Sequence, residues 1–120
     1  MKVLVQSDDF DIAAEINELT QGRTDVGAVV SFTGLVRDFH GDQKINQMTL
    51  EHFPGMAEKQ LKAICLQAGK RWPLQGGTVI HRYGPLYPGD QIVLVIILSA
   101  HREAAFEAAE FIMDWLKTDA

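Results

Sequence analysis

The sequence has only one cysteine, Cys65, so the chain cannot form an internal disulfide. This excludes the small secreted folds that disulfides hold together. Long apolar runs are also missing, because the longest, Ile92 to Leu98, falls far short of the roughly 20 residues that cross a membrane. The N-terminal stretch turns polar after Val5, too early for a signal peptide. We therefore expect a cytoplasmic protein without a membrane segment.

Clusters of basic residues are equally scarce. The chain has 11 lysines and arginines against 16 acidic residues, and its net charge is −5. An acidic chain without a basic stripe binds nucleic acid poorly, so we expect no nucleic-acid partner. A site for a small anion must then be local, built from a few basic residues that the fold brings together.

The rest of the composition is typical of one globular domain. Hydrophobic residues make up 47% of the chain and charged residues 22%. No repeat, linker or low-complexity stretch divides the 120 residues. A chain of this length buries enough surface for a core of its own, so we expect residues 1–120 to form a single domain.

The spacing of apolar residues predicts the order β-α-β-β-α-β-β-α. Helices are expected around Ile12, Ile16 and Leu19, and over residues 56–71 and 100–117. Strands are expected at residues 2–6, 27–36, 47–53, 78–83 and 92–98. The continuous apolar run of the last strand is typical of a central strand covered on both faces. Neighbouring strands without a helix between them favour an α+β fold.

Polar residues, proline and glycine predict where these elements end. Asp8 or Asp9 is placed to cap the first helix, and Gly22 to end it. Further breaks are expected at the polar loop 38–46, Pro54-Gly55, Pro73, Gly76-Gly77 and a turn over residues 85–90.

Cysteine and histidine do not form a metal-binding pattern. Cys65 shares a helical stripe with apolar residues, so we interpret it as a buried part of the core. None of the four histidines has the spacing of metal ligands. His52 and His81 lie in predicted strands and suit hydrogen-bonded positions at the edge of the core, whereas His40 lies in a polar loop. We predict neither a metal site nor a cofactor.

Four basic residues are better candidates for an anion site. His101 and Arg102 begin the last helix, where free backbone N–H groups and the helix dipole favour an anion. Basic residues are unfavourable in a first helical turn, which favours function over chance. Arg37 closes the strand 27–36, and Lys117 lies in the last turn of the last helix. Each also has a simpler interpretation, as a solvated surface residue or, for Lys117, as a cation that complements the dipole.

The length of the last helix constrains such a site. His101 and Lys117 are separated by 16 positions, or about 24 Å at ~1.5 Å per residue. They cannot serve one small molecule from a single chain. If both belong to one site, a second copy must complete it, and a twofold dimer would contain two equivalent composite sites.

The same residues occur in strings that match a known family. These strings are Val30–Arg37, Leu50–Met56, Val79–Gly84, Pro88–Asp90, Ser99–Arg102 and Phe111–Thr118. In them the chain resembles the large, catalytic subunit of molybdopterin synthase, in order and spacing from about residue 27 to the C-terminus. No single string is specific, but together they are a strong signal.

The resemblance implies an α/β-hammerhead fold and a homodimer of large subunits. It also implies a small ubiquitin-like sulfur-carrier subunit at each end of that dimer, which inserts a C-terminal Gly-Gly thiocarboxylate into the active site. The expected activity is sulfur transfer to cyclic pyranopterin monophosphate (precursor Z), which forms the dithiolene of molybdopterin in molybdenum cofactor biosynthesis.

The resemblance implies roles for several residues of this sequence. Lys117 would be the catalytic lysine, either orienting the thiocarboxylate or protonating a leaving oxygen. Substrate would be bound by Arg37, by the backbone of Leu35 and Val36, and by His101 and Arg102 of the neighbouring subunit. Phe32 and Met113 would line the channel for the carrier tail, Met113 one helical turn before Lys117.

One departure from the family pattern keeps other functions open. The family continues past the last helix into a Pro-aromatic-Trp-Lys segment that supplies a second active-site lysine, whereas this sequence stops at Ala120. We expect the chain to lack that segment. The alternatives are a non-enzymatic dimeric module that binds a phosphorylated pterin or nucleotide, and a purely structural dimer.

Overall fold

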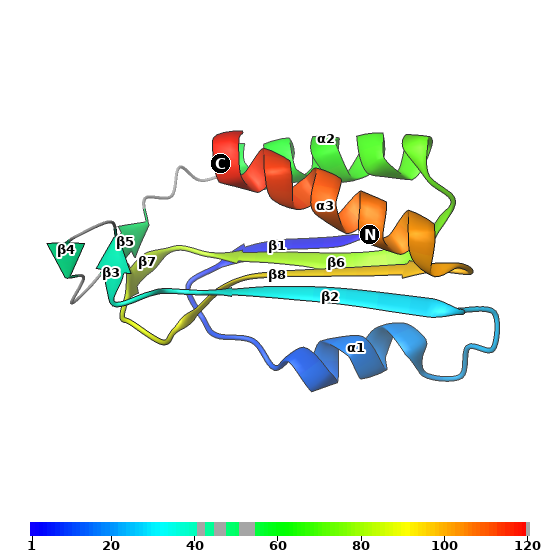
Figure 1. Ribbon diagram of the computed structural model, residues 1–120, viewed down its shortest axis with the longest axis horizontal. Helices are drawn as coiled ribbons and strands as arrows, with labels where there is room; N and C mark the ends of the chain where they lie inside the picture. The colour runs from blue at the N-terminus through cyan, green and yellow to red at the C-terminus, as the bar shows by residue number, and fades with distance from the viewer. Residues whose placement is uncertain (41–42, 45–47, 51–54, 120) are drawn as a thin grey trace.

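The computed structural model describes residues 1–40, 43–44, 48–50 and 55–119, with side chains for residues 1–38 and 55–117. The α+β class is confirmed (Figure 1). Compared with the predicted order, the chain has additional short strands beside the main sheet. Within the described residues, no helix combines the length and the apolar character needed to span a membrane.

The main sheet has four strands in the order β1-β6-β8-β2. β1 (Lys2–Gln6) runs parallel to β6 (Leu74–Arg82). β8 (Gln91–Ser99) lies between β6 and β2 (Ala28–Leu35) and is antiparallel to both. The predicted central position of the run 92–98 is therefore confirmed, and β1 and β2 form the two edges.

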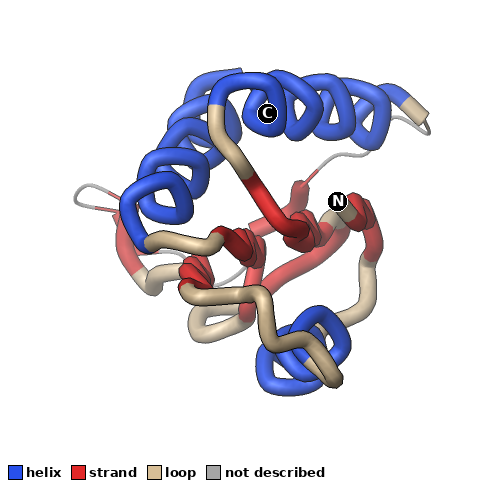
Figure 2. The backbone as a smooth tube through the Cα atoms, turned by 90° about the vertical axis from the view of Figure 1, so that its right-hand side faces the viewer, coloured by secondary structure: helices blue, strands red, loops and turns tan. Residues whose placement is uncertain are grey.

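Helices cover both faces of this sheet (Figures 1 and 2). α1 (Ile12–Thr20) packs on one face, and α2 (Met56–Arg71) and α3 (Arg102–Asp119) lie side by side on the other. The α2 range agrees with the prediction, and α3 begins and ends slightly later than expected. Each helix places an apolar stripe on the sheet, which is what buries the two halves of the core.

β8 contributes to both halves because its side chains alternate between the faces. Val93, Val95 and Ile97 join the cluster beneath α2 and α3. Leu94, Ile96 and Leu98 join the cluster against α1. With side chains buried on both faces, β8 has no need of a polar side, which explains its uninterrupted apolar sequence.

The start of β6 differs from the prediction. Gly76-Gly77 was expected to break the chain, but β6 begins at Leu74 and runs through both glycines, with a register shift between Leu74 and Gly76. Gly76 has a φ of 144°, a conformation that favours glycine. A Cβ atom on Gly77 would overlap the carbonyl oxygen of Ile96 in β8. The two glycines therefore allow close strand pairing and do not end the strand.

The predicted cap of α1 was also wrong. Asp11, not Asp8 or Asp9, caps the helix, and its carboxylate accepts the N–H of Ala14 at 3.0 Å. Gly22, with a φ of 75°, follows the last residues of the helix, as expected.

Short strands form the remaining region, at the left of Figure 1. The segment 38–46 was predicted to be a loop, but β3 (Phe39–His40) and β4 (Gln43–Lys44) pair within it. β5 (Met48–Leu50) lies within the predicted strand 47–53, and the rest of that range, including His52, lies outside the described residues.

The turn predicted over residues 85–90 is shorter than expected. Pro85 belongs to β7 (Gly84–Leu86), which pairs with β5, so the turn spans residues 87–90. A proline is tolerated there because β7 pairs on only one side in the described part of the chain. The Asp90 N–H closes the turn by donating to the Tyr87 carbonyl at 2.9 Å.

Candidate functional site

The sequence-predicted residues lie at two separate ends of the main sheet. Ala28 of β2 pairs with Ser99, and Leu35 pairs with Gln91, so β2 begins where β8 ends. α3 follows β8 directly and runs back over the sheet, so its end lies toward the opposite end of the molecule from its start (Figure 1). The chain measures 44 × 26 × 26 Å.

His101 and Arg102 occupy the end where α3 begins. Both side chains are exposed in a hollow of about 790 Å³ whose lining also includes Gly27 and Phe106. The Gly27 N–H donates to the Ser99 carbonyl at 3.1 Å, and a Cβ on Gly27 would overlap the carbonyl oxygen of Ala100. A glycine is thus required for β2 to start close beneath the helix N-terminus. The hollow, which Glu103 and Glu107 also line, offers an anion the Arg102 guanidinium, the His101 ring and the N–H groups of a helix N-terminus.

Arg37 lies at the other end, just after β2. It is exposed in a second hollow lined by Val36, Asp38, Pro88 and Gly89. The Val36 side chain is buried, and both of its backbone polar groups are paired. Its N–H donates to the Asp90 carbonyl at 2.9 Å, and its carbonyl accepts the Gly89 N–H at 2.8 Å.

These bonds bear on the predicted substrate contacts. A substrate role for the Val36 backbone stays a prediction. The substrate would have to share the Val36 N–H and carbonyl with the 87–90 turn, which already binds both. Leu35, in contrast, has a side chain that is 56% exposed beside Arg37.

The predicted channel residues Phe32 and Met113 lie on the α3 side of the sheet. Phe32 follows Ala28 and Val30 at two-residue spacing, and those residues pack against the core beneath α2 and α3. Phe32 itself is 43% exposed, and Met113 is half-buried against the same core. Lys117 is exposed four positions further along the helix, so it shares a helix face with Met113.

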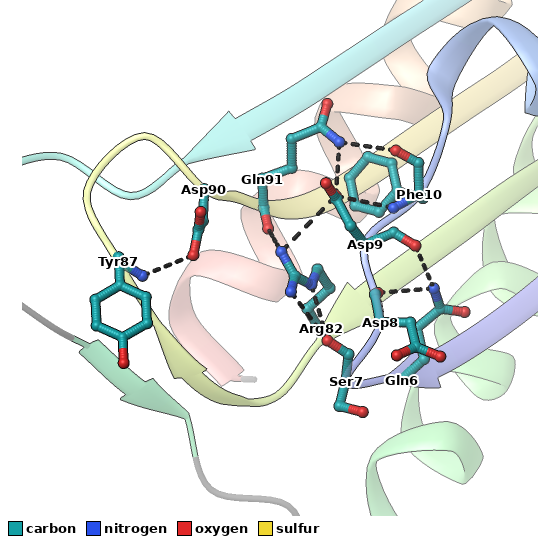
Figure 3. Close-up of polar contacts among 9 residues, drawn as sticks. All are labelled: Gln6, Ser7, Asp8, Asp9, Phe10, Arg82, Tyr87, Asp90 and Gln91. Carbon is teal, nitrogen blue, oxygen red and sulfur yellow. Dashed lines mark hydrogen bonds and ion pairs between the residues drawn. The ribbon is translucent and has the colours of Figure 1, made fainter.

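A hydrogen-bond network that the sequence did not reveal lies beneath the Arg37 end (Figure 3). The Arg82 guanidinium donates from Nε and Nη2 to the Ser7 carbonyl at 3.1 and 3.0 Å, and from Nη1 to the Gln91 carbonyl at 2.9 Å. Gln91 Nε2 in turn donates to Asp9 Oδ1 and the Phe10 carbonyl, both at 2.8 Å. The Gln91 amide and the Phe10 N–H lower the pKa of Asp9.

The remaining titratable residues have structural roles. Cys65 is buried, and this burial raises its pKa to about 11, so the thiol stays protonated at neutral pH. His81 is half-buried with Nδ1 at 2.9 Å from the Arg82 carbonyl, and burial lowers its pKa. No group of His, Cys, Asp and Glu among the described residues is arranged to hold a metal ion. The side chains of His40 and His52 lie outside that description.

The chain is similar over nearly its whole length to proteins of a known family. The family model described as MoaE protein matches residues 5–119. The chain is 60% identical to the molybdopterin synthase catalytic subunit of Mesorhizobium japonicum over 98% of its length and 73% of the relative's. It is 52% identical to the subunit of the same name from Brucella melitensis, over 100% and 72% of the two chains.

A solved structure shows that the fold is shared as well. The molybdopterin biosynthesis MoaE protein from Burkholderia ambifaria superimposes with a TM-score of 0.90 at 44% identity, covering 99% of this chain and 78% of that one. The match of the family model and the identity to curated relatives both extend over nearly the whole sequence. The chain belongs to the MoaE family.

Proposed function

We propose that this chain is the catalytic subunit of a molybdopterin synthase. It transfers sulfur from a thiocarboxylated carrier subunit to cyclic pyranopterin monophosphate. The observation that carries the proposal is the near full-length match to catalytic subunits of that name. The exposure of Arg37, His101, Arg102 and Lys117 supports it, because an acidic chain places these cations where a phosphorylated substrate can reach them.

The site is completed by a second copy of the chain. Within one chain, His101 and Arg102 lie at the opposite end of the sheet from Arg37. β2 is an edge strand with an unusual number of exposed apolar side chains, and exposed apolar surface of this kind marks an interaction site. Val29 is 41%, Phe32 43% and Leu35 56% exposed.

A twofold axis across β2 would bring the two ends together. Two β2 strands related by such an axis run antiparallel, so the beginning of one lies beside the end of its mate. His101 and Arg102 of one protomer then approach Arg37 of the other, and the dimer has two composite sites.

The basic residues divide between two tasks in the reaction. Arg37 with His101 and Arg102 of the second copy clamps the phosphate through charge-assisted hydrogen bonds. Lys117 orients the carrier thiocarboxylate or protonates the leaving oxygen of the substrate. In each transfer the thiocarboxylate sulfur bonds to a substrate carbon as the bond from that carbon to its leaving oxygen breaks, and water then cleaves the acyl–sulfur bond, which leaves sulfur on the substrate and a carboxylate on the carrier. A dithiolene has two sulfurs, so two carriers visit each site.

The first test is the substitution Lys117→Ala. We expect it to lower product formation at least ~100-fold, because positioned acid–base groups contribute about 10²–10⁴ to rates. The assay measures molybdopterin formed from thiocarboxylated carrier and cyclic pyranopterin monophosphate. Lys70→Ala is the matched control, since Lys70 is an exposed lysine on α2.

The outcomes separate the possible functions. Normal turnover by Lys117→Ala, with an unchanged elution volume in size-exclusion chromatography, would remove Lys117 from the mechanism. An unsubstituted protein that binds the phosphorylated pterin but never converts it would favour a non-enzymatic binding module.

A further inference from the structure

Arg82 is a largely buried arginine whose hydrogen bonds go to main-chain carbonyls and not to a carboxylate. Its side chain is only 12% exposed at the end of β6. Its ion pair with Asp9 is long, because Asp9 Oδ1 lies 3.7 Å from Nη1, beyond hydrogen-bond length. The guanidinium instead donates to the main-chain carbonyls of Ser7 and Gln91. A charge that is costly to bury is thus used to tie together backbone segments.

These two carbonyls belong to segments far apart in the sequence. Ser7 follows β1, 75 positions before Arg82, and Gln91 is the first residue of β8. The planar fork of arginine reaches both from one side chain, which the single ammonium of lysine cannot do. The Gln91 side chain extends the link to Asp9 and Phe10. Figure 3 shows this cluster beside the turn that contains Tyr87 and Asp90.

The link continues from Gln91 to the end of β2. The residue before Gln91 is Asp90, whose carbonyl accepts the Val36 N–H and whose carboxylate accepts the Tyr87 N–H at 2.8 Å. Gly89 donates its N–H to the Val36 carbonyl. Val36 is therefore held on both sides by a turn that Arg82 anchors at Gln91. The next residue is Arg37.

We infer that Arg82 is a positioning residue for Arg37, acting through Gln91 and the 87–90 turn. This inference rests on the proposed function, in which Arg37 binds the substrate phosphate. Arg82 does not touch the substrate. It holds the end of β2 in the place from which Arg37 meets the anion, and a small displacement of such a group weakens binding strongly.

The chain offers a matched control in Arg23. Its guanidinium also binds a distant carbonyl, donating from Nη1 to the Gln75 carbonyl at 2.9 Å, and it pairs with Asp25 at 2.8 Å. This fork ties the loop before β2 to the start of β6. It makes no contact with the 87–90 turn.

The experiment compares Arg82→Lys with Arg23→Lys by two measurements. The first measurement is the hydrogen-exchange rate of the Val36 and Gly89 amides, which donate the two hydrogen bonds at the end of β2. We expect both amides to exchange about tenfold faster or more in Arg82→Lys and to be unchanged in Arg23→Lys. Gln91→Ala is a second variant, because it removes the side-chain bonds from Gln91 to Asp9 and Phe10 while leaving Arg82 in place.

Steady-state kinetics test whether the displacement reaches Arg37. We expect Arg82→Lys to raise the KM for cyclic pyranopterin monophosphate about tenfold while kcat stays within about threefold, the signature of weaker binding of the substrate. In an Arg37→Ala background the same substitution should have no further effect on KM, because the residue it positions is gone.

The outcomes distinguish this inference from the proposed function. Unchanged exchange at Val36 and Gly89 in both Arg82→Lys and Gln91→Ala overturns the link to β2. If the Val36 and Gly89 amides exchange faster in Arg82→Lys but the KM is unchanged, Arg82 does not position Arg37. The same conclusion follows if Arg82→Lys raises the KM equally in the Arg37→Ala background. Neither result contradicts the synthase activity. Absence of turnover in the unsubstituted protein overturns the proposed function, and the positioning role in that reaction with it, even where the exchange rates respond.

Discussion

Burial separates the titratable residues of this chain into two groups. Cys65 and His81 pack against the sheet, where burial disfavours the charged form and keeps each side chain neutral near pH 7. Arg37, Arg102 and Lys117 are exposed and keep their charge available to an anion. The buried, protonated Cys65 thiol is a poor sulfur nucleophile, and in our proposal the sulfur arrives on the carrier.

His81 is expected to make stability depend on pH. Because burial lowers its pKa below 6.5, the unfolded chain binds a proton where the folded chain does not. The stability contributed by neutral His81 is complete above pH 6.5 and declines as the pH falls below that value. The loss is at most about 1.4 kcal/mol per pH unit. Between pH 7.5 and 5.5, the free energy of unfolding should fall less in His81→Gln than in the unsubstituted protein. Urea denaturation at each pH measures this difference.

His101→Gln is the control for this measurement, because His101 is exposed at the start of α3. It should follow the pH dependence of the unsubstituted protein. An identical pH dependence for His81→Gln would show that another group controls stability in this range.

At the scale of elements, the close pairing of β6 with β8 sets the geometry of both sheet ends. β6 contributes Arg82 at its end and begins through Gly76-Gly77, where the strands approach too closely for a side chain on Gly77. On its other side β8 pairs with β2, with Ser99 beside Ala28 and Gln91 beside Leu35. β6 therefore has a glycine-dependent strand contact near its start and an arginine that binds distant carbonyls at its end.

Gly77→Ala should destabilise the fold. The added Cβ would overlap the Ile96 carbonyl oxygen, so the strands must move apart, and overpacking of this kind costs about 1–3 kcal/mol. Gly69→Ala is the matched control, because a Cβ there meets no atom within 4 Å on the α2 helix. Gly69→Ala should raise the free energy of unfolding by about 0.5 kcal/mol, because alanine favours a helix more than glycine does. Equal unfolding free energies for the two variants would contradict the close approach.

At the scale of the whole molecule, the elongated shape separates two sets of cations. His101 and Arg102 begin α3, and Lys117 is near its end, with about 24 Å of helix between them at ~1.5 Å per residue. β2, at ~3.4 Å per residue, spans a similar distance along the exposed edge of the sheet. If two copies joined along this edge, the His101 end of one protomer would lie beside the Arg37 end of the other, and neither protomer would have to change its fold.

A composite site predicts rescue in mixed dimers. Arg102→Ala and Lys117→Ala should each be inactive alone, because each removes one half of both sites. A mixed dimer retains one site with both residues intact, so mixing should restore activity to roughly a quarter of the unsubstituted level for random exchange between equal amounts. Subunit exchange is verified with differently tagged chains. Failure to recover any activity after proven exchange would contradict a shared site.

The sequence was enough to predict the three helices and the four strands of the main sheet, but not the short strands β3, β4 and β7. Apolar spacing placed α2, the buried stripe around Cys65 and the central strand β8, because each pattern depends on the helical or strand period alone. Only the folded chain brings Gly77 against Ile96 and places Arg82 within reach of Ser7, 75 positions away. Close approach and hydrogen bonding between distant segments arise only when the chain has folded, so no local pattern encodes them.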